Sequence, residues 1–270
     1  MPFSLKREGE LVYWCIPAFA EAGVTAAFST RLGGVSRGPY ATLNMGFHVG
    51  DDPAAVRENR RRFFRVLGFQ PEDLVEAEQV HGSRVQVIGK AQRGTEIPAT
   101  DALVTNIPGL LLGEFFADCV PLYFLDPRSR AVALAHAGWR GTVANIAAGT
   151  LEALSNAFGS RPEDCLVAIG PSIGPCCYEV DEHVVGPLRE SFPGWQEAVT
   201  PSGSGKWFLD LWEVNARQLR EKGVKNEHIL AGKICTACRP GQFFSYRAHG
   251  VTGRMAAAIA IQERRPHGQA

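Results

Sequence analysis

Three apolar segments follow one another within residues 110–135, which read LLLGEFFADCVPLYFLDPRSRAVALA. They are residues 110–117, 122–125 and 131–135. Only Gly113 and Glu114 interrupt the first segment, and Asp126-Pro127 marks a turn before the third. Continuous apolar runs of this length are typical of strands that are buried on both faces. The stretch therefore predicts a buried β-sheet at the centre of the fold.

Further strands and helices are expected on both sides of this stretch. Strands are predicted at residues 24–30, 85–88, 102–105 and 166–169, and helices at 52–67, 142–158 and around 212–219. Asp51 or Asp52 can cap the first helix, Pro53 suits its first turn, and Gly159 can end the second. Residues 200–206 are expected to form a surface loop. Since many strands lack a following helix, the pattern favours a mixed sheet core covered by helices.

The composition excludes several classes of protein. The chain has 270 residues, 45% of them hydrophobic, and its 28 basic and 28 acidic residues give a net charge of zero. A neutral chain argues against a broad nucleic-acid footprint and against a polybasic membrane anchor. No apolar run reaches the roughly 20 residues that a membrane-spanning helix requires. We expect a cytoplasmic protein that binds neither nucleic acid nor membrane.

Seven cysteines are present, an odd number at irregular spacing, which argues against a secreted disulfide framework. Cys235 and Cys238 form a CxxC motif, but a second such pair is missing, which argues against a four-cysteine zinc site. Cys176 and Cys177 are adjacent, and neighbouring cysteines rarely bond to each other. All four are interpreted mainly as packing or turn residues.

Three short segments each carry one side chain that can bind a metal, next to glycine or proline. These side chains are His81, Cys119 and His136. Two imidazoles and a thiolate suit zinc, and three protein ligands with a fourth position open are typical of a catalytic zinc site. Their spacing is too wide for a zinc finger, so only the fold can bring them together. Each residue alone also fits a plain structural role, as a hydrogen-bonded buried histidine or a small apolar cysteine.

The segment after His136 suggests an anion site. Gly138-Trp139-Arg140-Gly141 leads into the helix expected from Thr142, whose first amides lack partners within the helix and attract anions. The guanidinium of Arg140 fits phosphate. The alternative is that Thr142 caps the helix and Arg140 forms a structural ion pair.

Three further polar residues are candidates for the same site. Asp118, beside Cys119, could accept a hydrogen bond from a histidine ligand or act as a general base. Its alternative role is a turn residue that binds local backbone amides. Arg31 and Asn44 lie in a glycine-rich early segment and could contact a ligand, or they could be solvated loop positions.

Motifs along nearly the whole chain resemble those of the YfiH/YlmD family, which is described as a laccase-domain or multicopper polyphenol oxidase family and includes FAMIN-like purine nucleoside phosphorylases. The matching stretches are residues 28–36, 43–44, 48–52, 79–82, 101–105, 117–119, 136–141, 170–171, 176–180 and 252–254. One departure is visible, because Ala248-His249 follows Ser245-Tyr246-Arg247 where the family often has a basic and then an acidic residue.

The resemblance implies one domain over residues 1–270, of the α/β (α+β) class, built as a layered αββα sandwich with mixed sheets. It implies a Zn²⁺ ion held by His81, Cys119 and His136. It also implies a purine nucleoside phosphorylase that acts with phosphate on adenosine, inosine and methylthioadenosine, and an adenosine deaminase activity. On that basis Cys119, Asp118 and Arg140 are expected in catalysis, and Arg31, Asn44 and Arg140 in binding substrate or phosphate.

Other functions remain open from the residues. A cysteine hydrolase could use Cys119 as nucleophile and His136 as base, and a cell-wall precursor editing enzyme would be a hydrolase of that kind. A zinc-dependent binding protein without catalysis is a third class. The older polyphenol oxidase assignment is chemically weak, because the chain has only seven histidines and only two of them fall in the candidate site. His48, in a matching motif, is interpreted as part of a distant loop.

Overall fold

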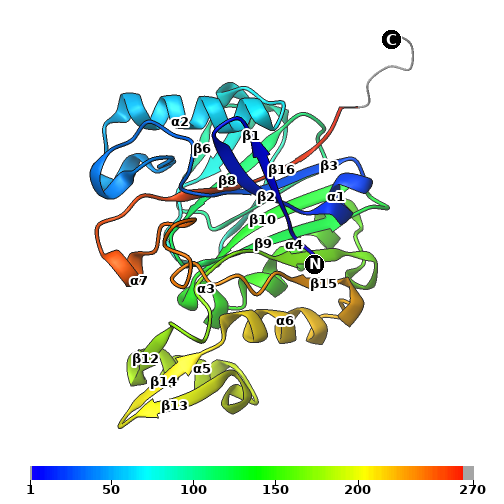
Figure 1. The fold of residues 1–270 in the computed structure, drawn as a ribbon. Helices are drawn as coiled ribbons and strands as arrows, with labels where there is room; N and C mark the ends of the chain where they lie inside the picture. Colours follow the sequence, from blue (N-terminus) through cyan, green and yellow to red (C-terminus); the bar gives the residue numbers. More distant parts are fainter. Residues whose placement is uncertain (1, 264–270) are drawn as a thin grey trace.

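Two large β-sheets stacked face to face form the centre of the molecule, and helices cover their outer faces (Figure 1). The computed structural model describes residues 2–263. The layers are, in order, helix α2 (Pro53–Val66), a seven-stranded sheet, a six-stranded sheet, and helices α4 (Ile146–Phe158) and α6 (Leu211–Glu221). This is the expected αββα sandwich.

The seven-stranded sheet carries α2 on its outer face. Its strands are, in spatial order, β1 (Ser4–Glu8), β2 (Leu11–Cys15), β3 (Val24–Ser29), β16 (Met255–Ile261), β8 (Leu111–Phe116), β4 (Leu74–Ala77) and β6 (Glu96–Ile97). Neighbours from β1 to β8 are antiparallel, whereas β4 runs parallel to both β8 and β6. The sheet is therefore mixed, and its strands come from both ends of the chain.

The six-stranded sheet contains the apolar stretch that predicted a buried sheet. Its strands are, in spatial order, β15 (Ile229–Ala231), β11 (Leu166–Ile169), β9 (Val120–Asp126), β10 (Ala131–Ala137), β7 (Ala102–Thr105) and β5 (Val85–Val87). β9 and β10 form an antiparallel hairpin, and every residue of the two strands is buried. The turn between them is the one that Asp126-Pro127 predicts.

Alternating side chains of β9 reach two different cores. Tyr123 and Leu125 pack between the two sheets, while Leu122 and Phe124 pack under the helices. Successive residues of a strand point to opposite faces, so a strand enclosed on both faces must be apolar throughout. This explains why the sequence of the strand lacks the alternation that marks a half-exposed sheet.

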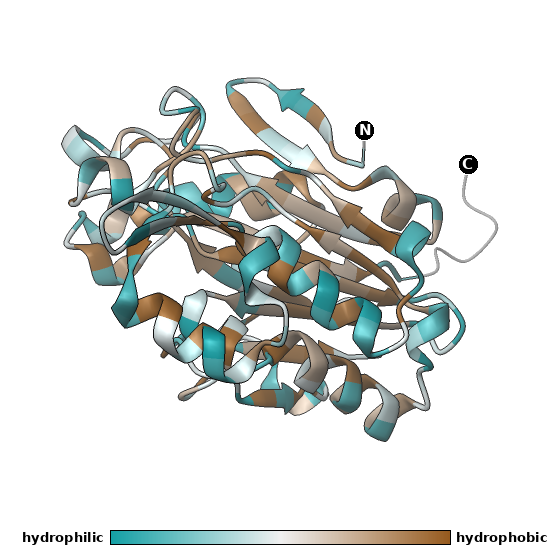
Figure 2. Ribbon diagram, turned by 90° about the horizontal axis from the view of Figure 1, so that it is seen from below, coloured by the Kyte–Doolittle hydropathy of each residue, from teal (hydrophilic) through white to brown (hydrophobic). Residues whose placement is uncertain are grey.

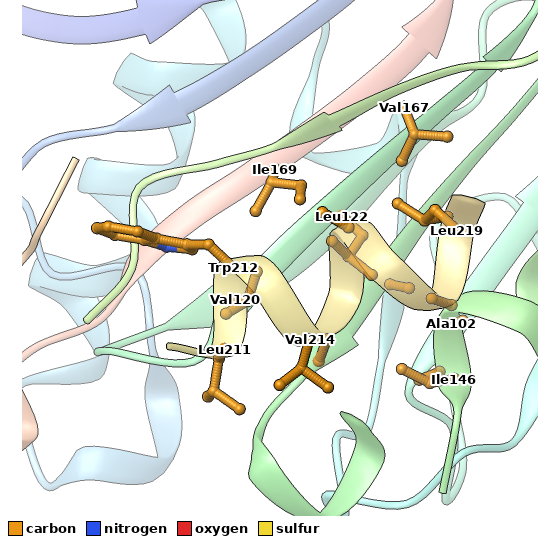
Figure 3. Packing of buried hydrophobic residues seen from close by; sticks show 14 of the residues in the cluster. Ala102, Val120, Leu122, Ile146, Val167, Ile169, Leu211, Trp212, Val214 and Leu219 are labelled. Atoms are coloured by element: carbon orange, nitrogen blue, oxygen red, sulfur yellow. The ribbon is translucent and has the colours of Figure 1, made fainter. Parts of the chain in front are cut away.

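Helix α6 seals the outer face of the six-stranded sheet (Figure 3). Leu211, Val214 and Leu219 belong to the same buried cluster as residues of the strands. The indole nitrogen of Trp212 donates to the hydroxyl of Ser172 at 2.6 Å. Figure 2 shows the same division in colour, since hydrophobic residues follow the interior strands and hydrophilic ones gather on the outer helices and loops. No helix within residues 2–263 is long and apolar enough to cross a bilayer.

A small third sheet lies beyond α6, at the bottom of Figure 1. Its strands are, in spatial order, β12 (Glu179–Asp181), β14 (Lys206–Leu209) and β13 (Val199–Gly203). The expectation of a plain loop at residues 200–206 is wrong, because much of it pairs with β14 as an exposed hairpin arm. Pairing with a neighbouring strand supplies backbone hydrogen bonds that the polar composition does not reveal.

The remaining helices are short. They are α1 (Pro17–Glu21), α3 (Trp139–Val143), α5 (Glu182–Ser191) and α7 (Tyr246–His249), with 3₁₀ turns at Gly38–Tyr40, Phe47–Val49, Pro71–Asp73, Lys90–Gln92, Pro162–Asp164, Trp195–Ala198 and Asn226–His228.

The helix expected over residues 142–158 is divided into α3 and α4. Asn145 separates them, because it adopts a left-handed conformation with φ 58° that asparagine tolerates better than most residues. Its side chain then accepts a hydrogen bond from the amide of Ala148 and caps α4. Thr142 lies inside α3, is fully buried and accepts a hydrogen bond from Asn215, so it does not cap the long helix.

The two central sheets are joined by a buried hydrogen bond in which Tyr123 of β9 donates to the carbonyl oxygen of Ala27 in β3 at 2.9 Å. We predict that Tyr123→Phe lowers the free energy of unfolding by about 1 kcal/mol or more, because a buried acceptor loses its donor. Urea unfolding measures the change. Tyr246→Phe, at a site where the side chain is 63% exposed, should leave the midpoint unchanged. Equal midpoints for Tyr123→Phe and the wild type would contradict this account.

Candidate metal centre

Three segments that are far apart in the sequence bring their side chains together at one end of the sandwich. His81 lies in the loop after β4, Cys119 directly precedes β9, and His136 lies in β10. The antiparallel pairing of β9 with β10 places Pro121 opposite His136, which brings Cys119 beside that histidine. The ligand atoms of the three residues all lie within 4.8 Å of one another. The two imidazole rings meet edge to face, with centroids 4.7 Å apart.

One buried carboxylate contacts the ring of His136 and the backbone of the loop that carries His81. Asp101, directly before β7, is fully buried, and its Oδ1 lies 2.8 Å from Nδ1 of His136. The same carboxylate accepts the backbone amides of His81 at 2.9 Å and Gly82 at 2.7 Å. The Nδ1–H of His136 therefore points to Asp101, and its Nε2 is free to face a metal. Carboxylate–histidine pairs of this kind fix the orientation of metal-ligating histidines.

The backbone around the three side chains is locally strained. His81 has φ 60° and Asp118 has φ 92°, both in the left-handed region that side chains other than glycine rarely adopt. Strain of this kind persists only where surrounding bonds hold it, and it is common at functional sites. The hydrogen bond that the backbone amide of His81 donates to the carboxylate of Asp101 is one such restraint.

Two glycines allow the segments to approach closely. A Cβ on Gly138 would lie 3.1 Å from Sγ of Cys119 and 3.3 Å from Cδ2 of His81. A Cβ on Gly141 would lie 2.8 Å from the carbonyl oxygen of Gly82. The Gly-Trp-Arg-Gly segment thus packs directly against two of the three candidate ligands. A side chain at either glycine would press against these neighbours.

The charges at the centre favour a thiolate. Burial opposes ionisation of Cys119, but the imidazoles of His136 and His81 outweigh it and lower the thiol pKa to about 6. Burial likewise opposes protonation of His136, but Cys119 and Asp101 outweigh it and raise the pKa of the imidazole. A thiolate between two imidazoles, one of them oriented by a carboxylate, is a donor set that fits a divalent ion of borderline softness. His81, Cys119 and His136 are the residues that would hold it.

A cavity of about 770 Å³ opens above these side chains. It lies within the size range of small-molecule sites. Its walls combine aromatic, basic and acidic groups: Phe47, His48, Arg60, Glu76, Ala77, Glu78, Gln79, His81, Glu96, Phe115, Ala117, Cys119, His136, Tyr246 and Arg254. The expectation that His48 belongs to a distant loop is therefore wrong, because the fold returns this loop to the cavity.

Asp118 does not orient a histidine, contrary to one sequence-based expectation. Its Oδ1 accepts the hydroxyl of Thr236 at 2.7 Å, and its Oδ2 accepts the hydroxyl of Ser245 at 3.0 Å and the amide of Arg247 at 2.7 Å. The carboxylate therefore ties the segment before β9 to the loop that leads into α7. Asp101 orients His136 instead, and the sequence signal for it was its place at the start of the 101–105 motif.

Arg31 and Asn44 bind the backbone of neighbouring loops. The guanidinium of Arg31 donates to the carbonyls of Ala41 at 2.9 Å and Pro240 at 3.0 Å. Asn44 is fully buried, and its Oδ1 accepts the amides of Gly46 at 3.0 Å and Arg254 at 2.8 Å. Neither residue is among those that line the cavity.

Arg140 lies in α3 and is not among the residues that line the cavity. Its side chain is exposed and stacks on the ring of Trp139, with the guanidinium carbon 4.5 Å from the ring centroid.

Sequence reasoning missed the two guanidinium groups in the cavity wall. Arg60 pairs there with Glu76 at 3.0 Å, and Arg254 donates to the carbonyls of Thr252 and Gly253. The 252–254 motif was the available signal for Arg254.

Comparison with known proteins gives a consistent result. Residues 25–262 match the family model described as multi-copper polyphenol oxidoreductase laccase. The chain is 46% identical over 255 residues to "Purine nucleoside phosphorylase YlmD" of Geobacillus stearothermophilus, covering 90% of this chain and 92% of that protein. It is 39% identical over 241 residues to "Purine nucleoside phosphorylase YfiH" of Escherichia coli, covering 88% and 93%.

Solved structures agree with the sequence relatives. The crystal structure of YlmD from Geobacillus stearothermophilus superimposes with a TM-score of 0.92 at 43% identity, covering 97% of this chain and all of that one. The crystal structure of the Bacillus licheniformis hypothetical protein YfiH also gives a TM-score of 0.92, at 37% identity over 97% of this chain and 99% of that one. Sequence, fold and the family motifs around the three candidate ligands lead to one conclusion: the chain belongs to the YfiH/YlmD laccase-domain family.

Proposed function

We propose that the chain, as one domain, is a zinc-dependent purine nucleoside phosphorylase. It acts on adenosine, inosine and methylthioadenosine, and it also deaminates adenosine. The observation that carries this proposal is the convergence of His81, Cys119 and His136 in the wall of a cavity large enough for a nucleoside. The names of the relatives support the reaction class.

Zinc is the proposed ion because two imidazoles and one thiolate match its ligand preference, and the three donors leave a fourth position open. When bound, such an ion lowers the pKa of a water ligand to about 7 and can polarise an oxygen of the substrate. The seven cysteines are free in the structure, which agrees with the reducing cytoplasm as the proposed location.

The cavity wall supplies the groups that a nucleoside requires. Phe47, Phe115 and Tyr246 offer ring faces against which a purine can stack. Glu76 and Glu78 offer carboxylates that can accept hydrogen bonds from ribose hydroxyls. Phosphorolysis passes through a cationic sugar, and nearby carboxylates and phosphate stabilise that charge.

The proposed phosphate ligands are Arg254, in the cavity wall, and Arg140, an exposed residue of α3. Arg31 and Asn44 are proposed to act indirectly. Asn44 holds the amides of Gly46 and Arg254, so it fixes the loop of His48 and the position of the Arg254 backbone. Asp118 is proposed to keep Cys119 in place through its bonds to Thr236 and Ser245.

The cysteine hydrolase is a second candidate, since the geometry that suits a metal also lowers the pKa of the Cys119 thiol beside His136. The two functions differ in whether the Cys119 thiolate is bound to a metal or is free to react. A zinc-bound thiolate resists alkylation until the metal is removed, whereas a free nucleophile reacts at once. Rapid alkylation of Cys119 in the protein as isolated, with full loss of activity and no zinc present, would favour the hydrolase.

The first test concerns phosphate. Purified protein should release free base from adenosine, inosine and methylthioadenosine only when inorganic phosphate is present, with ribose 1-phosphate or its methylthio analogue as the second product. Chromatography of the reaction mixture measures both products. Cys119→Ala should reduce the rate by more than about 100-fold and lower the zinc content. Loss of a direct metal ligand should cost more than loss of a residue that only orients a ligand, which typically costs about 10- to 100-fold. Base release without phosphate would refute phosphorolysis.

The second test concerns Asp101. Asp101→Asn should weaken zinc binding by about 10- to 100-fold, because an amide cannot accept the amides of His81 and Gly82 and the His136 Nδ1–H together. Competition with a fluorescent zinc chelator measures the affinity. Asp126→Asn is the matched control, since this carboxylate is also buried and accepts Ser129 and Arg128, but at the far end of β9. Equal zinc affinities for the two variants would contradict the role of Asp101.

The third test concerns Arg254. Arg254→Gln should raise the KM for phosphate by about tenfold or more with a smaller effect on the KM for inosine, because one charge-assisted hydrogen bond is lost. Steady-state kinetics with each substrate varied in turn separates the two. Arg61→Gln, an exposed residue of α2 that pairs with Glu58, is the control and should behave as the wild type. A phosphate KM that is unchanged in Arg254→Gln would remove this residue from the phosphate site.

A further inference from the structure

Four cysteines gather at the surface, outside the candidate metal centre. Cys176 and Cys177 follow the loop after β11, and Cys235 and Cys238 lie between β15 and α7. The four sulfur atoms all lie within 4.8 Å of one another. The interpretation of these residues as packing or turn positions did not foresee that the two pairs meet. The adjacent pair supplies the second half of the site that the CxxC motif lacked in the sequence.

The distances fit a tetrahedral site. The Sγ atoms of Cys176 and Cys177 lie 3.3 and 3.4 Å from the Sγ of Cys238. With zinc–sulfur bonds of about 2.3 Å, tetrahedral geometry separates the sulfurs by roughly 3.8 Å. Shifts of the sulfur atoms by a few tenths of an ångström therefore suffice to accommodate an ion. Four thiolates with no open position are the ligand set of structural zinc sites.

The surrounding backbone already holds the four side chains in place. The amide of Gly174 donates to the Sγ of Cys235 at 3.3 Å, a bond of the kind that supports a metal-bound thiolate. The carbonyl of the same Gly174 accepts the amide of Cys177 at 3.0 Å, which shapes the turn that presents both adjacent thiols. Ser172 and Cys235 form a short bridge between the two loops, in which the amide of Thr236 donates to the carbonyl of Ser172 at 3.0 Å.

We propose that Cys176, Cys177, Cys235 and Cys238 bind a second zinc ion, with a structural role. This site clamps the loop after β11 to the segment that precedes α7. The same two segments reach Asp118, because Ile173 donates its amide to the Asp118 carbonyl at 2.9 Å and Thr236 donates its hydroxyl to the Asp118 carboxylate. The structural ion would therefore hold in place the two segments that bind Asp118, the residue next to Cys119. This inference does not depend on the proposed enzymatic function.

The test counts zinc ions in the full-length protein, purified with a phosphine reductant and without chelators. Native mass spectrometry, checked by elemental analysis, should find two zinc ions per chain in the wild type. The double variant Cys235→Ser/Cys238→Ser should lose one equivalent and keep the other. Cys119→Ser should also lose one, from the other site. Cys15→Ser is the matched control, because Cys15 ends β2 away from both clusters, and it should retain two.

A second measurement leaves all four cysteines of the cluster intact, so it does not depend on whether the double variant folds. Cobalt replacing zinc in Cys119→Ser should give the intense thiolate-to-cobalt charge-transfer bands and visible absorption of a tetrahedral four-sulfur site. Counting alkylated thiols without reduction tests whether the cluster holds a disulfide instead. A zinc content that is the same in Cys235→Ser/Cys238→Ser as in the wild type, an absence of the cobalt–thiolate bands, or a disulfide within the cluster of the zinc-loaded protein would overturn the proposal.

Discussion

The buried carboxylate of Asp101 is the constraint on which the candidate centre depends. It accepts the Nδ1–H of His136 from β10 and the backbone amides of His81 and Gly82 from the loop after β4. The loop and the strand are far apart in the sequence, and no disulfide joins them. Because the carboxylate is fully buried, water does not compete for these bonds, and its desolvation is compensated by four donors if the longer contact from Val80 is included.

A second carboxylate, that of Asp118, supports the segment that carries Cys119. Asp118 binds Thr236, Ser245 and the amide of Arg247, so the residue beside Cys119 is tied to the C-terminal part of the chain. The stacked sheets form the rigid base beneath both carboxylates, and β9 and β10 deliver Cys119 and His136 from one hairpin. Both proposed metal sites are thus connected to Asp118. The first site contains its neighbour Cys119, and the second lies on the two loops whose residues Ile173 and Thr236 bind Asp118.

Local sequence patterns predicted the interior of the fold better than its edges. The apolar stretch of residues 110–135 predicted β8, β9 and β10 because burial on both faces favours apolar side chains at most positions. The division of the 142–158 helix at Asn145 was missed, since a left-handed asparagine depends on tertiary contacts that no local pattern records. Residues 200–206 were misassigned for the same reason, because their strand partner is supplied by the fold.

The candidate ligands were predictable because histidine and cysteine beside glycine or proline are chemically distinctive. The role of Asp101 was not, since its place in the 101–105 motif marks the residue but does not show that its carboxylate meets His136. Likewise, the adjacent Cys176 and Cys177 and the distant CxxC motif gave no sign of meeting, because their contact depends on two loops that the six-stranded sheet places side by side. His48 and Arg254 reach the cavity through the same long-range folding.

The central claim is that His81, Cys119 and His136 share one divalent ion. Anomalous diffraction recorded on both sides of the zinc absorption edge tests it most directly. The account predicts a zinc-specific peak within about 2.0–2.3 Å of the two imidazoles and the thiolate, with His136 bound through Nε2 while Nδ1 remains on Asp101. Crystals of protein isolated with zinc that show no such peak at these three side chains would contradict it.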